Sequence, residues 1–166
     1  VPVMVMERGF LDRTNRTQID HAGFNHTASW AVDIAGPAPV GGVARFAGLL
    51  DTIGRRIPVR ARRRGGVLIL GQVSGDAQLC DSEIQHARDL VRVVENAAGA
   101  GADIRFRPHP HDKWRSGRND LDGELSDAID TARFAITINS NSANEALLRG
   151  CPVLCLGPSL QGVAGV

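Results

Sequence analysis

Residues 66–157 alternate short apolar stretches with amphipathic ones, and this alternation restricts the possible folds more than any other feature of the chain. Short stretches rich in Val, Ile and Leu and bounded by turn residues predict buried strands. Strands are predicted at residues 67–71, 103–107, 134–139 and 152–157, with helices between them at 81–98, 121–132 and 141–149. Strands joined by helical crossovers pair in parallel, so the sequence predicts an α/β fold, a Rossmann-like parallel sheet with helices on both faces.

Residues at both ends of the first predicted helix suit its start and its stop. Ser82 and Gln85 stand at capping-box spacing, in which each side chain bonds the backbone of the other. Gly99 and Gly101 follow the last apolar position, where glycine commonly ends a helix.

The segment before residue 65 lacks this regularity. A short apolar run at Val3–Met6 predicts a buried strand, although no neighbouring strand is apparent for it. Residues 12–42 are rich in Asn, Thr, Gly and Pro, which predicts a long loop region with room for one short helix. Residues 43–54 place their apolar side chains on one helical face. A basic segment with six arginines follows at 55–64.

Composition narrows the classes of partner and compartment. Nineteen basic and eighteen acidic residues nearly cancel, so wholesale attraction to nucleic acid or membrane is not expected. The arginines of residues 55–64 lack interleaved aromatic side chains for base stacking, which makes nucleic acid the weakest candidate partner. Three cysteines without a C-x-x-C pair favour a reducing, cytoplasmic setting. The apolar run before Glu7 is too short for a membrane span.

Ligands of open parallel sheets bind at the carboxyl ends of the strands. Three loops follow predicted strands at that edge. They are GQVSGDAQ at residues 71–78, RPHPHDK at 107–113 and SNSANE at 140–145. The sequence therefore predicts a binding site built from these three loops.

The loop RPHPHDK contains the most distinctive chemistry of the three. Arg107 and His109 offer charge-assisted hydrogen bonds to a phosphate, and the two prolines stiffen the loop. His109 and His111 are also spaced like a metal-chelating pair, but no third ligand is marked by spacing. A polar surface turn is the plain interpretation of His111 and Lys113. We expect His109 to belong to a phosphate site and expect no metal.

The segment SNSANE passes from a strand into a helix. Ser140, Asn141 and Ser142 offer hydroxyl, amide and free backbone N–H groups that suit an anion, although these residues also cap ordinary helices. Glu145, one turn further on, suits either a surface charge or an acceptor for ribose hydroxyl groups.

The loop GQVSGDAQ and the segment around Glu7 add further candidates. Gln72 and Asp76 offer an amide and a carboxylate to a base or sugar. Glu7 is a candidate general base, with a surface salt bridge as the alternative. The chain contains no G-x-x-x-x-G-K-[ST] loop and no G-x-S-x-G elbow, which argues against P-loop and α/β-hydrolase chemistry.

The ordered motifs ERGF, GQVSGDA, RPHP and NSNSANEALLRGCPVLCLG resemble the capsule polysaccharide biosynthesis family, glycosyltransferase-like proteins related to Kdo transferases. The resemblance implies a GT-B architecture of two Rossmann-like domains, the second of which holds a nucleotide-sugar donor. It implies donor phosphate contacts for His109, Ser140 and Ser142. It further places Glu145 near the ribose, and Gln72 and Asp76 in the nucleotide pocket.

A complete GT-B enzyme needs more chain than 166 residues. We therefore expect residues 1–64 to be a remnant of a first domain with a loop and a basic connector. Residues 65–166 are then a Rossmann-like domain that is incomplete at its C-terminus. A missing domain or a second copy of the chain would be a partner, beside the nucleotide sugar and a glycan acceptor.

Three functions stay open. The first is a glycosyltransferase that uses a nucleotide sugar as a substrate, with a CMP-linked sugar as a candidate, and needs no further cofactor. The second is a noncatalytic module that binds nucleotide sugar or phosphate. The third is a nucleotide-sugar epimerase, because GT-B epimerases also carry a Ser-rich helix start followed by Glu.

Overall fold

The computed structural model describes residues 3–8, 15–31, 41–52 and 65–163. The chain divides into two compact units, Val1–Ile57 with Ser159–Val166 and Pro58–Pro158. Several sequence-based expectations lie outside the described residues. These are the basic connector 55–64, the end of the helix predicted at 43–54, and residues 9–13 of ERGFLDR.

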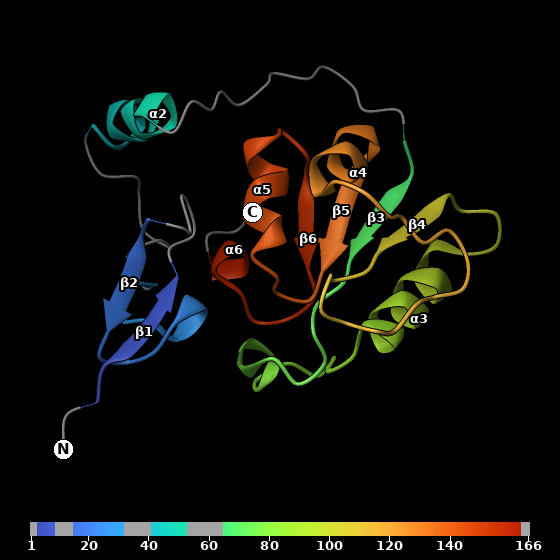
Figure 1. Ribbon diagram of the computed structural model, residues 1–166, viewed down its shortest axis with the longest axis horizontal. Coiled ribbons are helices and arrows are strands. Elements are labelled where there is room, and N and C mark those ends of the chain that lie inside the picture. Colours follow the sequence, from blue (N-terminus) through green and yellow to red (C-terminus); the bar gives the residue numbers. More distant parts are fainter. Residues whose placement is uncertain (1–2, 9–14, 32–40, 53–64, 164–166) are drawn as a thin grey trace. The chain divides into compact units, whose positions relative to one another are not determined.

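The unit Pro58–Pro158 is built on a four-stranded sheet (Figure 1). Its strands are β3 (Val67–Leu70), β4 (Ile104–Arg107), β5 (Phe134–Thr137) and β6 (Val153–Cys155). The strand order is β4-β3-β5-β6, and every neighbouring pair is parallel. The predicted parallel sheet is therefore confirmed, with each strand inside its predicted range.

Helices cover both faces of this sheet, as predicted. They are α3 (Ala87–Ala98), α4 (Leu125–Thr131) and α5 (Ser142–Leu148). Because successive side chains of a strand point to opposite faces, Ile69 packs with Leu90 of α3, while Leu68 packs with Ile129 of α4. Full burial of one such side chain contributes about 1.5–3 kcal/mol.

The start of α3 differs from the prediction. The helix begins at Ala87, and residues 77–79 form the short 3-10 helix η2 (Ala77–Leu79). Ser82 Oγ accepts from the backbone N–H of Ile84 at 3.2 Å, and the Gln85 amide donates to the carbonyls of Leu79 and Ser82. The predicted capping box is therefore wrong, because these side chains close a turn that precedes the helix. The predicted stop at Gly99 is confirmed, with φ at 77°.

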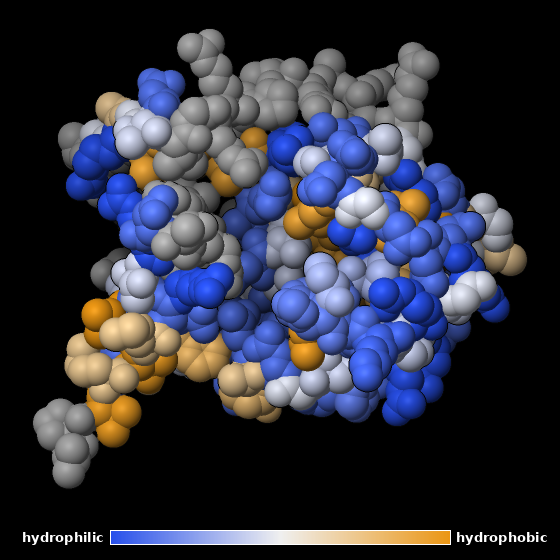
Figure 2. Space-filling view, viewed as in Figure 1, coloured by the Kyte–Doolittle hydropathy of each residue, from blue (hydrophilic) through white to orange (hydrophobic). Residues whose placement is uncertain are grey.

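The other unit contains the antiparallel strands β1 (Val5–Arg8) and β2 (Thr17–Asp20). The strand expected at Val3–Met6 is present in shifted form as β1. Its expected burial and lack of a neighbour are wrong, because β1 pairs with β2 and Met4 and Met6 are 59% and 69% exposed. Figure 2 shows this apolar surface as orange atoms beside the grey N-terminal residues. The expectation of a loop over residues 12–42 missed β2 because its sequence, TQID, contains a single strongly apolar residue.

Asp20 closes the end of β2. Its carboxylate accepts hydrogen bonds from the backbone N–H groups of Ala22 and Gly23 and from the backbone and hydroxyl of Ser29, the last at 2.6 Å. The Ser29 hydroxyl, with these backbone donors, holds the pKa of the Asp20 carboxyl well below its usual range. The charged carboxylate therefore shapes the turn that leads to the 3-10 helix η1 (Asn25–Thr27).

Two helices complete the same unit. The predicted helix at 43–54 is present as α2 (Gly42–Thr52). The chain returns to this unit as α6 (Leu160–Val163), where the backbone N–H of Leu160 donates to Asn25 Oδ1 at 2.9 Å.

No helix among the described residues has the length and apolar character needed to cross a membrane.

Candidate functional site

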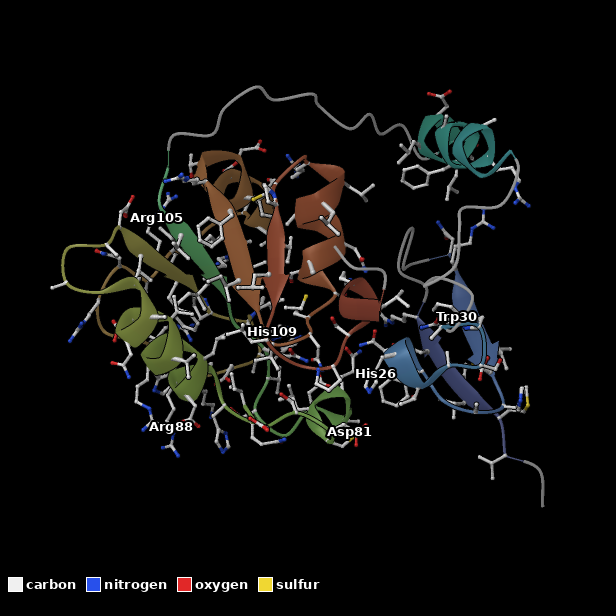
Figure 3. The ribbon with its side chains drawn as sticks, turned by 180° about the vertical axis from the view of Figure 1, so that it is seen from behind. His26, Trp30, Asp81, Arg88, Arg105 and His109 are labelled. Atoms are coloured by element: carbon white, nitrogen blue, oxygen red, sulfur yellow. The ribbon has the colours of Figure 1, made fainter. Side chains whose placement is uncertain are left out.

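The three predicted loops meet in one small pocket of about 80 Å³ at the carboxyl edge of the sheet. Among the expected site residues it is lined by Arg107, His109 and Ser142. The remaining lining residues are Leu70, Gly71, Pro108, Pro110 and Leu125. Figure 3 shows His109 at the arrowhead end of the strands. The structure thus brings together the end of β3, the loop after β4 and the start of α5.

His109 is held in one tautomer by its own loop. The backbone N–H of His111 donates to His109 Nδ1 at 3.2 Å, and the backbone N–H of Asp112 donates to the His109 carbonyl at 2.9 Å. Because Nδ1 accepts this bond, the neutral ring carries its proton on Nε2. Nε2–H therefore remains the donor that this side chain offers to a ligand.

The environment of His109 favours the neutral ring. Burial lowers the pKa of the His109 imidazole below its usual value, and the nearby charge of His111 acts in the same direction. Asp76 and Asp112 act against this shift. The carboxylate of Asp76 thus acts on the His109 ring through its charge. It also caps η2, because its Oδ1 accepts from the backbone N–H of Gln78 at 3.0 Å.

The shift at His109 predicts a pH dependence of folding. Because the pKa is lowered in the folded state, the unfolded chain binds more protons as pH falls through about 6.5, so the free energy of unfolding decreases there. His109→Asn retains an acceptor near the Nδ1 position but does not titrate. We expect denaturant unfolding between pH 7.5 and pH 5.5 to show a weaker pH dependence for this variant. Identical slopes in the two proteins would contradict the assigned shift.

The serine segment is organised around Ser140. Its Oγ accepts from the backbone N–H of Ser142 at 3.2 Å and lies 3.2 Å from Ser142 Oγ. Ser140 is buried, whereas Ser142 is half-buried and lines the pocket. Asn141 Oδ1 accepts from the side chain of Asn144 at 3.5 Å. Of the three residues expected to bind an anion, Ser142 is therefore the one that presents its hydroxyl to the pocket.

Arg107 lines the pocket, but two hydrogen bonds fix its guanidinium group. It donates to the carbonyl of Leu121 at 3.0 Å and to the carbonyl of Gly123. These bonds hold the chain that leads into α4. The positive charge of Arg107 therefore lies beside the pocket while some of its donors serve the fold.

Two other expected site residues have partners within the protein. Gln72 is 4% exposed and its Nε2 donates to Asn139 Oδ1 at 2.9 Å. Glu145 lies 3.7 Å from Arg149 Nε, and Arg149 also pairs with Asp130 of α4 at 3.1 Å. The structure thus places Gln72 beneath the site, and Glu145 in an ion-pair cluster between α4 and α5.

Glu7 lies on β1, in the unit Val1–Ile57 with Ser159–Val166. Its Oε1 accepts from the backbone N–H of Arg8 at 2.8 Å. Its proposed role as a base remains a prediction, because it belongs to a different unit from His109.

Sequence reasoning missed Asn139 and Asp112. Asn139 is 2% exposed and pairs with Gln72. Asp112 Oδ2 accepts from the Ser74 hydroxyl at 3.3 Å, which links the loops after β3 and β4. The one signal for both residues was their place in segments that follow strands, where Asn and Asp are also ordinary turn residues.

A larger depression of about 440 Å³ lies beside α3 and β4. Its lining comes from α3, from residues 99–102, from Ile104 and Phe106 of β4, and from Ser116, Arg118 and Asn119, and it includes none of the predicted site residues. Glu95 and Arg118 form an exposed ion pair at 3.2 Å in its wall. Because the carboxyl edge is where parallel sheets bind ligands, the smaller pocket remains the candidate site.

Within the described part of the chain, no three His, Cys, Asp or Glu residues are grouped to hold a metal ion.

No protein-family model and no curated protein sequence matches the chain. Two solved structures from Thermosulfurimonas dismutans do match it, over 96% of its length in each case. KpsC described as a beta Kdo 2,7 transferase has a TM-score of 0.72 at 22% identity, and KpsC described as a beta Kdo 2,4 transferase has a TM-score of 0.64 at 18% identity. The chain has the fold of the matched part of these transferases.

This likeness confirms, at the level of the fold, the resemblance that the motifs indicated. The chain spans 58% of the length of the first solved chain and 63% of the second. The Kdo transfer reactions belong to those two proteins. For this chain, donor, acceptor and activity are matters for a proposal.

Proposed function

We propose that the unit Pro58–Pro158 binds the nucleotide-sugar donor of a glycosyl transfer reaction, with a CMP-linked sugar as the first candidate. The observation that carries the proposal is the pocket in which His109 and Ser142 meet at the carboxyl edge of the sheet. The fold shared with Kdo transferases supports the reaction class. The small volume of the pocket suits one phosphate group better than a whole nucleotide.

In this proposal His109 and Ser142 act on the donor phosphate. His109 Nε2–H and the Ser142 hydroxyl donate to phosphate oxygens, because Nδ1 is already engaged by His111 and Ser140 Oγ holds the Ser142 backbone. As the glycosidic bond to the donor breaks, negative charge grows on the departing phosphate. Donors fixed in place before the reaction stabilise that charge without reorganising. Arg107 adds positive charge at the pocket wall.

Two other functions stay in view. A noncatalytic binding module would hold the nucleotide sugar without turning it over. A nucleotide-sugar epimerase would release an isomerised sugar without any acceptor. Product analysis with a CMP-linked sugar, with and without a glycan acceptor, separates transfer, epimerisation and binding alone.

Titration calorimetry with CMP, UDP and cytidine tests the binding step. We expect saturable CMP binding that is stronger than cytidine binding, because the phosphate supplies the contacts to His109 and Ser142. UDP differs from CMP in its base and by a second phosphate, so its affinity compares the two donor classes. Equal affinities for CMP and cytidine, or no heat with any of the three in folded protein, would exclude the proposed phosphate site.

A further inference from the structure

Asn139 lies directly before the serine segment and is almost fully buried, at 2% exposure. Its side chain makes three hydrogen bonds to separate parts of the unit. Oδ1 accepts from Gln72 Nε2 at 2.9 Å, and Nδ2 donates to the carbonyls of Gln78 at 2.6 Å and Pro158 at 3.0 Å. One amide therefore ties the end of β5 to the loop after β3, to η2 and to the last residue of the unit.

The pairing with Gln72 also holds the backbone of Asn139 in place. Gln72 Oε1 accepts from the backbone N–H of Asn139 at 3.4 Å while Gln72 Nε2 reaches Asn139 Oδ1. The next residue, Ser140, has its N–H directed to Thr137 Oγ1 at 3.4 Å and accepts from Ser142 N–H. The position of Asn139 thus sets where Ser140 and, through it, Ser142 stand.

Other side chains of similar size cannot replace this amide. An aspartate would keep the acceptor for Gln72 but would face the carbonyls of Gln78 and Pro158 with no donor. An apolar side chain would remove all three hydrogen bonds and leave Gln72 Nε2 without this acceptor. Asparagine supplies the one acceptor and two donors that the site uses.

We infer that Asn139 is a positioning residue for the donor site, which with Gln72 holds the Ser140–Ser142 segment and the loop after β3 in a binding geometry. The inference rests on the proposed donor-binding function. It also gives Gln72 a supporting role beneath the pocket, in place of the direct nucleotide contact that the sequence predicted. Neither Asn139 nor Gln72 lines the pocket, so both act through other residues.

The test compares Asn139→Ala, Asn139→Asp and Gln72→Ala with Val94→Ala as a matched control. Val94 is a buried core residue of α3 outside the pocket, so its truncation lowers stability without removing a hydrogen bond of the loops. Calorimetry with CMP and cytidine, thermal unfolding and hydrogen exchange are measured on each folded variant. Gln72→Ala removes one of the links and keeps the inference testable if Asn139→Ala does not fold.

We expect Asn139→Ala and Asn139→Asp to weaken CMP binding by about tenfold to 100-fold, the range seen when supporting residues are removed from metal sites. Because the hydrogen bonds that weaken are those to phosphate, cytidine affinity should change far less. Hydrogen exchange should accelerate at residues 72–78 and 140–148. Val94→Ala should lower the melting temperature and leave both affinities unchanged.

Loss of CMP affinity in proportion to melting temperature, for Val94→Ala as for Asn139→Ala, would overturn the inference. If wild-type protein binds no CMP, the proposed function fails, and hydrogen exchange alone then decides the role of Asn139. Faster exchange confined to residues 72–78 and 140–148 would support positioning, and uniform acceleration across the unit would refute it.

Discussion

Replacing His109 with asparagine is expected to weaken CMP binding by about 30-fold, which corresponds to roughly 2 kcal/mol for a lost hydrogen bond to a charged group. Asparagine Oδ1 retains an acceptor near Nδ1, so the bond from the His111 backbone is preserved while the Nε2 donor is removed. Glutamine places an amide N–H near the Nε2 position and should restore part of the affinity. Calorimetry at pH 7.5 measures all three proteins.

His111→Asn is the matched control for this experiment. The ring of His111 is exposed, and its backbone N–H, which contacts His109, is unchanged by the substitution. We expect the affinity for CMP to stay within about twofold, as for a surface substitution. Equal losses in His109→Asn and His111→Asn would show that the histidine pair acts by charge alone and that the assigned tautomer has no part in binding.

Leu68→Ala is expected to lower the free energy of unfolding by about 3 kcal/mol, within the range for large-to-small changes in a core. Leu68 is fully buried on the face of the sheet that α4 and α5 cover, where it packs with Ile129 and Ala146. Truncation leaves a cavity between the two layers. Urea unfolding followed by circular dichroism measures the change.

Leu154→Ala removes the same atoms from an exposed position of the same sheet. Leu154 lies on β6 and is 49% exposed, so the expected change is within about 0.5 kcal/mol. A loss at Leu154 as large as the loss at Leu68 would mean that the outer face of β6 is buried in solution.

The fold of the unit Pro58–Pro158 was largely readable from the sequence because its periodicity is strong. The apolar strands pack against the amphipathic helix α3 on one face of the sheet and against α4 and α5 on the other. Glycine marks the end of α3. The start of α3 was not readable. Ser82 and Gln85 have the residue types of a capping box, but local hydrogen bonds with Ile84 and Leu79 use them in a turn before the helix instead.

In the other unit, β2 and its pairing with β1 were missed for a different reason. Burial alternates along both strands of the pair Val5–Arg8 and Thr17–Asp20, but their sequences, VMER and TQID, do not alternate between apolar and polar residues, which is the signal that sequence reasoning detects. A set of hydrogen bonds to the Asp20 carboxylate fixes the turn after β2, and the sequence does not show these bonds.

The edge that carries the site followed from strand order, but the role of each side chain did not. His109 and Ser142 lie together as the loop positions implied. Gln72 and Asn139, both polar and both next to strand ends, look equally suited to a ligand in the sequence, yet they are buried against each other. Whether a polar side chain faces a ligand or another loop depends on long-range contacts that a single sequence does not display.

The most direct test of the proposed donor site is a CMP titration followed residue by residue through backbone amide NMR signals. Saturable shifts are predicted at Gly71, His109 and Ser142, and they should disappear when cytidine replaces CMP. The depression lined by residues 99–102 and 116–119 should remain unaffected. Shifts confined to that depression, or shifts at the pocket that cytidine reproduces, would contradict a phosphate site at His109.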